Sequence, residues 1–194
     1  TQGEEGIIAG SNQRSVLLAV YEYLKQNGCR WLFPGTDGEY IPKVESLKSI
    51  KYRKKADKKF RGQCIEGAVT QDNVLAAIDF APKIGMNAYM LECENPYGYY
   101  DHWYSQPFNP SRIKETVTQL NTLQWKRQCE TEIKKRGLMY HDVGHGFTMV
   151  PLGIDALNYV NEISDEYKEF IAMLDGKREI FDGEAIYTNI CMSN

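Results

Sequence analysis

The sequence predicts an α/β fold that joins the end of a small α/β domain to the first units of a (β/α)8, or TIM-type, barrel. Short apolar segments of strand length alternate along the chain with longer segments whose apolar residues recur at helical spacing. Such alternation is typical of parallel strands connected by helices. The predicted boundaries are residues 1–45 for the small domain, 46–59 for a basic linker, and 60–194 for three β/α units of a partial barrel.

The composition is that of an ordinary soluble globular protein. Of the 194 residues, 42% are apolar and 25% are charged, and the net charge of −3 gives no electrostatic argument for nucleic-acid binding. No apolar run approaches the roughly 20 residues that span a bilayer, so we expect no membrane insertion. The five cysteines include no Cys-x-x-Cys pair, which argues against a disulfide framework and a structural zinc site. We expect no cofactor and no metal.

The small domain is predicted to contain a strand, a helix and a second strand. Residues 6–10 are a short apolar stretch between glycines, and residues 12–15 carry side chains that favour the start of a helix. Apolar residues then recur at helical spacing as far as Gly28, a good helix stop. Residues 29–33 predict the second strand. The basic linker that follows lacks a pattern of interleaved aromatic residues, so we interpret it as a solvated connector rather than a nucleic-acid site.

The first barrel units are predicted from residue 60 onward. Residues 60–66 form a short strand that ends in a carboxylate, and Thr70 and Asp72 begin a helix that Pro82 bends or ends. Residues 88–91 are a continuous apolar run, as expected of a parallel strand covered on both faces.

A third unit follows a long segment, residues 95–121, that predicts an aromatic loop. The next helix begins at Asn121 or Thr122, and Lys126 lies on its apolar face. Residues 138–141 predict a strand. Ser164 caps a further predicted helix, and residues 185–191 are a last apolar segment.

Polar residues follow each of the three predicted barrel strands. In a barrel, active-site residues lie at the carboxyl ends of the strands, so these side chains are expected to share one cleft. The residues are Glu66 after the first strand, Glu92 and Glu94 after the second, and His141, Asp142 and His145 after the third.

Two of these groups allow more than one interpretation. His141, Asp142 and His145 suggest a metal site, but the two histidines leave a strand and enter a glycine turn instead of lying on one helix face as in the zinc hydrolase motif. Arg61 is expected near the mouth, where its guanidinium either pairs with Glu66 or Asp142 or holds sugar hydroxyls.

The aromatic loop also has two interpretations. Its tyrosines and tryptophan can stack on the apolar face of a sugar ring, or they can pack the loop onto the rim of the barrel. The candidates for stacking are Tyr99, Tyr100, Trp103 and Tyr104.

The residues also resemble a known family. Residues 28–35 and 38–42 resemble the end of the small α/β domain that precedes the barrel in glycoside hydrolase family 20. The same domain occurs in family 67 α-glucuronidases and in a related group of bacterial proteins that includes family 163 endo-β-N-acetylglucosaminidases. The segment from Arg61 to Glu66 is similar to the first barrel strand of family 20. Residues 142–145 are similar to its Asp-Met-Pro-Gly-His motif, one residue shorter, and residues 189–192 to a Leu-Cys segment.

The resemblance implies a fragment of a retaining, substrate-assisted β-N-acetylglucosaminidase-like enzyme that acts on N-acetylhexosamine-containing glycans. In such enzymes the sugar's N-acetyl oxygen attacks the anomeric carbon. The family's catalytic Asp-Glu pair follows strand four, so the resemblance implies that this pair lies beyond Asn194 and that the chain alone is inactive. The residues expected to contact substrate are Arg61, Glu66, Glu92, Glu94, Trp103, Tyr104, His141, Asp142 and His145.

Two other functions stay open at this point. One is a non-catalytic carbohydrate-binding module that uses the aromatic loop, and the other is a metal-dependent hydrolase that uses His141, Asp142 and His145. The expected partner is a glycan for both the glycoside hydrolase and the carbohydrate-binding module. The open edge of a partial barrel also favours self-association. The resemblance points to a bacterial protein that is secreted or periplasmic.

Overall fold

The centre of the structure is a three-stranded parallel sheet in the order β3-β4-β5. A computed structural model describes residues 5–65, 69–106, 116–148, 150–152, 154, 163–183 and 187–193. In the sheet, Gly62 of β3 pairs with Ala88 of β4, and Glu92 at the end of β4 pairs with Val143 at the end of β5. The sequence-based prediction of a mixed α/β fold with parallel strands is therefore confirmed.

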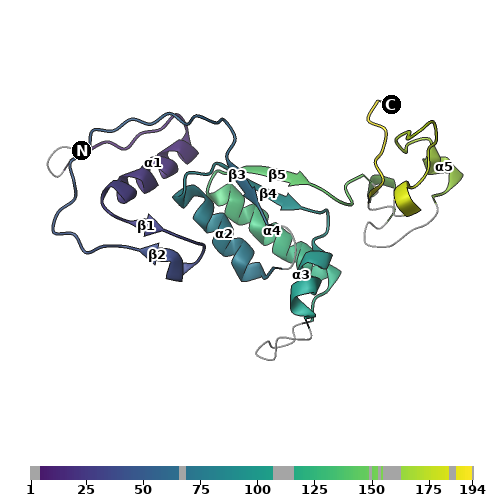
Figure 1. Cartoon of the computed structure of the whole chain (residues 1–194), viewed down its shortest axis with the longest axis horizontal. Coiled ribbons are helices and arrows are strands. Elements are labelled where there is room, and N and C mark those ends of the chain that lie inside the picture. The colour runs from purple at the N-terminus through teal and green to yellow at the C-terminus, as the bar shows by residue number, and fades with distance from the viewer. Residues whose placement is uncertain are drawn as a thin grey trace.

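The remaining elements are arranged around this sheet (Figure 1). In chain order the helices and strands are α1 (Gln13–Gln26), β1 (Arg30–Trp31), η1 (Thr36–Gly38), β2 (Glu39–Tyr40), β3 (Gly62–Cys64), α2 (Gln71–Lys83), β4 (Ala88–Glu92), α3 (Tyr97–Tyr104), α4 (Gln119–Lys135), β5 (Met139–Val143), η2 (Val150–Leu152), α5 (Asp165–Lys168) and η3 (Phe181–Gly183).

Helices α2 and α4 pack side by side and cover one face of the sheet. The apolar residues of α2 recur at positions 74, 77, 78 and 81, so they form one buried stripe. Its amino end is capped by the side chain of Thr70, which accepts a hydrogen bond from Asn73 N. In α4 a capping box joins Thr118 and Asn121. The main core lies between these two helices and the sheet.

The other face of the sheet is more open. Side chains alternate along a strand, so those of Met90 and Glu92 lie on the face opposite to Tyr89 and Leu91. His141 and Val143 of β5 share this face, and both are exposed. The described residues thus form a sheet with one covered face, and they do not form a closed barrel.

The first 45 residues differ from their predicted arrangement. Residues 6–10 form no strand, and Ile7 is 89% exposed. The second predicted strand is shorter than expected, and β1 pairs antiparallel with β2 in a small hairpin. The pairing is antiparallel because the turns at Gly35 and Gly38 bring the chain directly back, whereas a parallel neighbour needs a longer crossover.

Two further predictions are corrected by the structure. The long aromatic segment is not all loop, because it contains the two-turn helix α3. The helix after Ser164 is only the four residues of α5, and Ile171 instead forms an antiparallel bridge with Ile190. The helix was expected to carry Tyr167, Phe170, Ile171 and Leu174. It is shorter because Ile171 and Leu174 take part in antiparallel bridges, the latter with Lys177, instead of helical hydrogen bonds.

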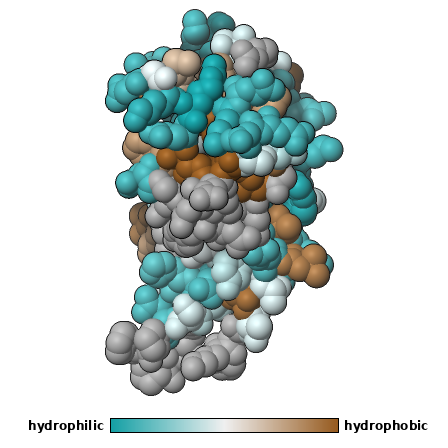
Figure 2. Space-filling model, turned by 90° about the vertical axis from the view of Figure 1, so that its right-hand side faces the viewer, coloured by the Kyte–Doolittle hydropathy of each residue, from teal (hydrophilic) through white to brown (hydrophobic). Residues whose placement is uncertain are grey.

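The C-terminal segment has a small core of its own. Leu152, Ile163 and Ile171 are buried there together. Figure 2 views the molecule from this side, and apolar side chains lie in a brown band across the middle while hydrophilic ones cover the upper part.

Candidate functional site

Polar side chains converge at the carboxyl edge of the sheet. Glu92 is the last residue of β4, and the chain that leaves β5 turns back so that His145 Nε2 lies 3.9 Å from Glu92 Oε1. The side chain of Glu92 is 17% exposed and that of His145 is 41% exposed. The rings of Tyr187 and His145 lie nearly perpendicular to each other, with their centroids 5.1 Å apart. These three residues offer a carboxylate, an imidazole and an aromatic surface that solvent can reach.

A glycine makes the approach of the two loops possible. Gly144 has a φ of 101°, and a Cβ atom added there would lie 2.6 Å from Glu92 Cγ. The loops are joined by two backbone hydrogen bonds, from Cys93 N to Val143 O at 3.0 Å and from Glu94 N to His145 O at 3.0 Å. Glycine is therefore required both for the backbone angle and for the space that Glu92 occupies.

Cys93 occupies a strained position between the two glutamates. Its φ of 70° is left-handed, which for a residue with a Cβ costs on the order of 1–2 kcal/mol. Burial, assisted by the negative charge of Glu92, raises the pKa of its thiol to about 11. The thiol is thus protonated at neutral pH and is a poor nucleophile.

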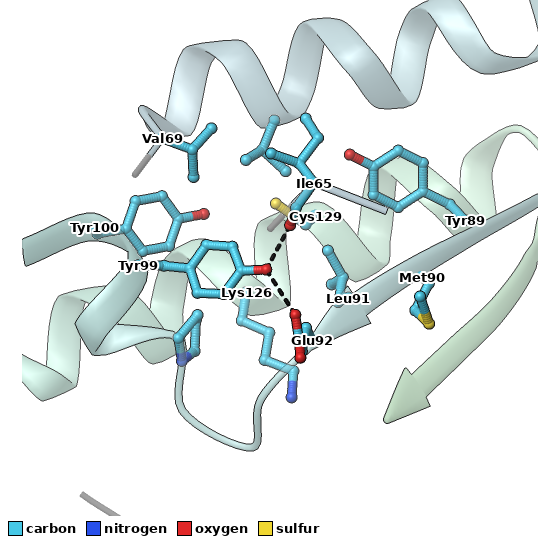
Figure 3. A pocket seen from close by; sticks show the side chains of 12 residues that line it. Ile65, Val69, Tyr89, Met90, Leu91, Glu92, Tyr99, Tyr100, Lys126 and Cys129 are labelled. Carbon is cyan, nitrogen blue, oxygen red and sulfur yellow. Dashed lines mark hydrogen bonds between the residues drawn. The ribbon is translucent and has the colours of Figure 1, made fainter. Parts of the chain in front are cut away.

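Tyr99 of α3 orients Glu92. Its hydroxyl lies 2.5 Å from the backbone oxygen of Ile65 and 3.0 Å from Glu92 Oε2 (Figure 3). Burial and the hydrogen bond to Glu92 raise the pKa of Tyr99 above its usual range, so its hydroxyl keeps its proton at neutral pH. This contact connects the ends of β3 and β4 to α3.

Lys126 of α4 joins the loop after β4 to strand β5. Its ammonium group donates to Cys93 O at 2.9 Å and to Glu94 O at 3.0 Å, and it pairs with Asp142 Oδ1 at 2.8 Å. The side chain of Lys126 is only 4% exposed. A buried cation needs such partners because an unpaired charge is costly to remove from water. Lys126 and Asp142 are therefore positioning residues that fix the site.

A small cavity of about 30 Å³ lies beneath the edge, between the sheet and the helices. It is lined by residues that include Tyr89, Glu92, Tyr99, Lys126 and Cys129 (Figure 3). Pockets for organic ligands commonly measure about 300–1,000 Å³. A sugar ring cannot enter a cavity of this size.

The predicted site residues do not all meet. Glu92, Glu94, Asp142 and His145 come together, although Glu94 takes part through its backbone. Glu66 lies outside the described residues. Trp103 is 37% exposed on α3, whereas Tyr104 packs against Trp125 with ring centroids 5.7 Å apart. Tyr104 thus contributes to packing, and its role in substrate binding stays a prediction.

Arg61 lies at the opposite edge of the sheet. Its guanidinium donates to Gly85 O at 2.9 Å and to Lys58 O at 2.5 Å. The expectation that it lies at the mouth was wrong, because Arg61 precedes the first residue of β3 and so belongs to the amino edge. Its role in substrate binding stays a prediction.

The three residues of the suggested metal site also separate. Asp142 faces the helices and pairs with Lys126, whereas His141, the preceding residue of β5, faces the open side and contacts the Phe60 ring. Within the described part of the chain, no group of three or more His, Cys, Asp or Glu side chains could hold a metal ion. The alternative of a metal-dependent hydrolase built on these three residues therefore finds no support.

Sequence reasoning missed Tyr187 and the role of Lys126. A lysine on the apolar face of a helix was a usable signal, because such a residue is buried only when it has partners. No comparable signal marked Tyr187, which reaches His145 only through the path of the C-terminal segment.

Comparisons with known proteins add no family assignment. No protein-family model matches the chain, and neither a curated protein nor a solved structure matches it. A search for membrane spans among the described residues found no helix with the length and apolarity that crossing a bilayer requires.

Proposed function

We propose that this chain is part of a glycoside hydrolase that acts on N-acetylhexosamine-containing glycans, and that the carboxyl edge of its sheet contacts the substrate. The sequence resemblance supports the substrate class. The observation that carries the site is the approach of Glu92 and His145 to 3.9 Å at the ends of two neighbouring parallel strands. Ligands of α/β folds bind at this edge of the sheet.

The side chains at this edge suit a sugar. Glu92 accepts hydrogen bonds from hydroxyl or amide groups, and Tyr99 holds its carboxylate in place. His145 offers a ring nitrogen, and Tyr187 is 49% exposed and offers an apolar surface beside it. We assign the catalytic step to no residue of this chain.

We further propose that β3, β4 and β5 are the first strands of a partial (β/α)8 barrel. The open face of the sheet supports this, because in a barrel that face points inward and is covered by the remaining strands. Met90, His141 and Val143 lie on it.

Sugar binding to the chain tests the proposed site. We expect titration with N,N′,N″-triacetylchitotriose to give saturable NMR shifts at Glu92, His145 and Tyr187. Glu92→Gln removes a charged acceptor, and such hydrogen bonds contribute about 1.5–3 kcal/mol, so the affinity should fall at least tenfold.

The matched control is Glu169→Gln, which removes the same charge at an exposed position of the C-terminal segment. Its affinity should equal that of the wild type. Absence of saturable shifts in the wild type, or equal loss of affinity in both variants, would contradict the proposed site.

A further inference from the structure

The segment 51–59 is the most strongly charged part of the chain. It contains six lysine or arginine residues and one aspartate, a net charge of +5 in nine residues, while the whole chain carries −3. All nine residues are exposed, and none belongs to a helix or strand. In Figure 1 this basic segment is part of the long open trace that runs from β2 around α1 to β3.

The basic segment is anchored near both of its ends. Before it, Lys48 N donates to Asn27 Oδ1 at 2.8 Å. Within it, Lys54 Nζ lies 3.3 Å from Glu22 Oε2 of α1. At its end, Asn87 Nδ2 donates to Lys59 O at 2.8 Å. The segment is therefore a positioned part of the surface.

Most of its cations are not neutralised. Among the described residues, no carboxylate forms an ion pair with Lys51, Arg53, Lys55 or Lys58. Successive residues of an extended chain lie about 3.3–3.6 Å apart, so neighbouring charges lie within the Debye length of about 8 Å at physiological salt. They repel each other, and the anchors keep them together. A polyanion relieves this repulsion and releases its own counterions on binding.

We propose that the basic segment binds an acidic polysaccharide that carries sulfate or carboxylate groups. The segment offers point charges and little else, since five of its six cations are lysines and Tyr52 is its one aromatic residue. Single-stranded nucleic acids are bound through several stacked aromatic side chains, and duplex DNA is read mainly by a helix or a β-ribbon in the groove. The choice of a polysaccharide also rests on the proposed function.

Binding to purified polyanions tests this proposal. The chain should bind heparin or polygalacturonate. Its affinity should fall steeply as the NaCl concentration rises from about 0.05 M to about 0.3 M, a range that brackets physiological ionic strength. Replacement of Lys51, Arg53, Lys55 and Lys58 by glutamine should weaken this binding at least tenfold. All four side chains are exposed, and circular dichroism should confirm that the variant is folded.

The matched control replaces Arg127, Lys134, Lys135 and Lys177 by glutamine. It removes the same one arginine and three lysines from other surfaces, so the two variants have equal net charge. Its affinity should stay within twofold of the wild type. An equal loss in this control, no binding of either polysaccharide, or tighter binding of oligo(dT) or phosphatidylserine vesicles at the same salt would overturn the proposal.

A second readout separates this proposal from the proposed function. The basic-segment variant should bind neutral triacetylchitotriose as the wild type does, and Glu92→Gln should bind heparin as the wild type does. If triacetylchitotriose never binds but heparin binding depends on the segment, the proposed function fails and the acidic-polysaccharide site stands.

Discussion

At the scale of single residues, the carboxyl edge depends on backbone angles that few side chains tolerate. Gly144 has no side chain and so leaves space for that of Glu92, and the neighbouring Cys93 has a positive φ angle. Together they let the loop after β5 return over the end of β4. The distance between Glu92 and His145 is therefore a property of the backbone as much as of the two side chains.

Replacement of Gly144 by alanine should disturb this edge. A Cβ atom would meet Glu92 Cγ at 2.6 Å and would sit at a φ of 101°, so we expect a loss of about 2 kcal/mol or more in unfolding free energy and a weaker affinity for triacetylchitotriose. Urea denaturation measures the first effect and NMR titration the second.

Gly98→Ala is the control for this substitution. Gly98 lies inside α3, where an added Cβ meets no atom within 4 Å, so alanine should stabilise the protein by about 0.5–1 kcal/mol. If the two variants have the same stability, the argument from the close approach at Gly144 is wrong.

Strand ends were the predictable part of the site. Glu92, Asp142 and His145 were found because polar residues follow apolar runs, and the structure brings these ends together. The incorrect predictions concerned the face of the sheet on which a side chain lies and the end of the strand to which a residue belongs. His141 and Asp142 are adjacent in sequence, and a strand sends adjacent side chains to opposite faces. Arg61 lies at the start of a strand, which is the edge opposite to the mouth.

At the scale of elements, a network of charges joins the helices to the first hairpin. Lys83 of α2 pairs with Glu39 of β2 at 2.5 Å and also with Asp79. Asp79 accepts from Arg136 at the end of α4 at 2.7 Å, and Arg136 pairs with Glu132. This network connects α2, α4 and β2 to one another.

The network predicts a dependence of stability on pH. Burial raises the pKa of Asp79, but hydrogen bonds from Lys83 and Arg136 outweigh it and hold the pKa below its usual value. A lowered pKa in the folded state stabilises the protein above the unfolded pKa of about 3.9, and this contribution is lost as the pH falls through the folded pKa.

The measurement compares the wild type with Asp79→Asn in urea between pH 2 and pH 7, a range chosen to bracket the carboxyl pKa of about 3.9. The difference in unfolding free energy should be largest near neutral pH and should shrink in acid below about pH 4. Glu45→Gln, at an exposed position without an ion pair among the described residues, is the control. A difference that does not change with pH would show that the Asp79 charge does not stabilise the fold.

Helices with a clear apolar period were predictable, and short elements were not. The apolar stripe of α2 and the buried face of α4 predicted both helices, and Gly137 marked the end of the second. Helix α3 was hidden because aromatic residues surround Gly98 without a period. The strands β1 and β2 are two residues each, and their pairing is set by the turn between them.

At the scale of the whole molecule, the described part of the chain contains two clusters of buried apolar residues. The larger lies between α2, α4 and the sheet, and the smaller contains Leu152, Ile163 and Ile171. The C-terminal segment also exposes large apolar side chains, among them Met173 at 59% and Leu174 at 56%. With so little buried surface of its own, this segment should be the less stable part.

Ile171→Ala should therefore unfold the C-terminal segment alone. Ile171 is 1% exposed, and truncation of a buried isoleucine costs about 2–5 kcal/mol, which we expect to exceed the stability of so small a core. Hydrogen exchange should show that amides of residues 163–183 and 187–193 lose protection while those of α2 and α4 keep it.

Ile133→Ala serves as the comparison, because Ile133 is fully buried in the larger core. It should lower protection in α2 and α4. Equal loss of protection in α4 from Ile171→Ala would mean that the two cores unfold as one unit. The α/β class of the whole could be predicted from the alternation of segments, whereas the separate C-terminal core depends on contacts such as Ile171 with Ile190 that no local pattern records.

The small cavity beside Tyr89 has a consequence for volume. Tyr89 is 1% exposed, and among the described residues its hydroxyl has no hydrogen-bond partner. The partly open cavity of about 30 Å³ that it lines exists only in the folded chain. Because internal voids disappear on unfolding, the folded state has the larger volume at this point. Hydrostatic pressure should therefore favour the unfolded chain, and the space beneath Glu92 contributes to this difference in volume.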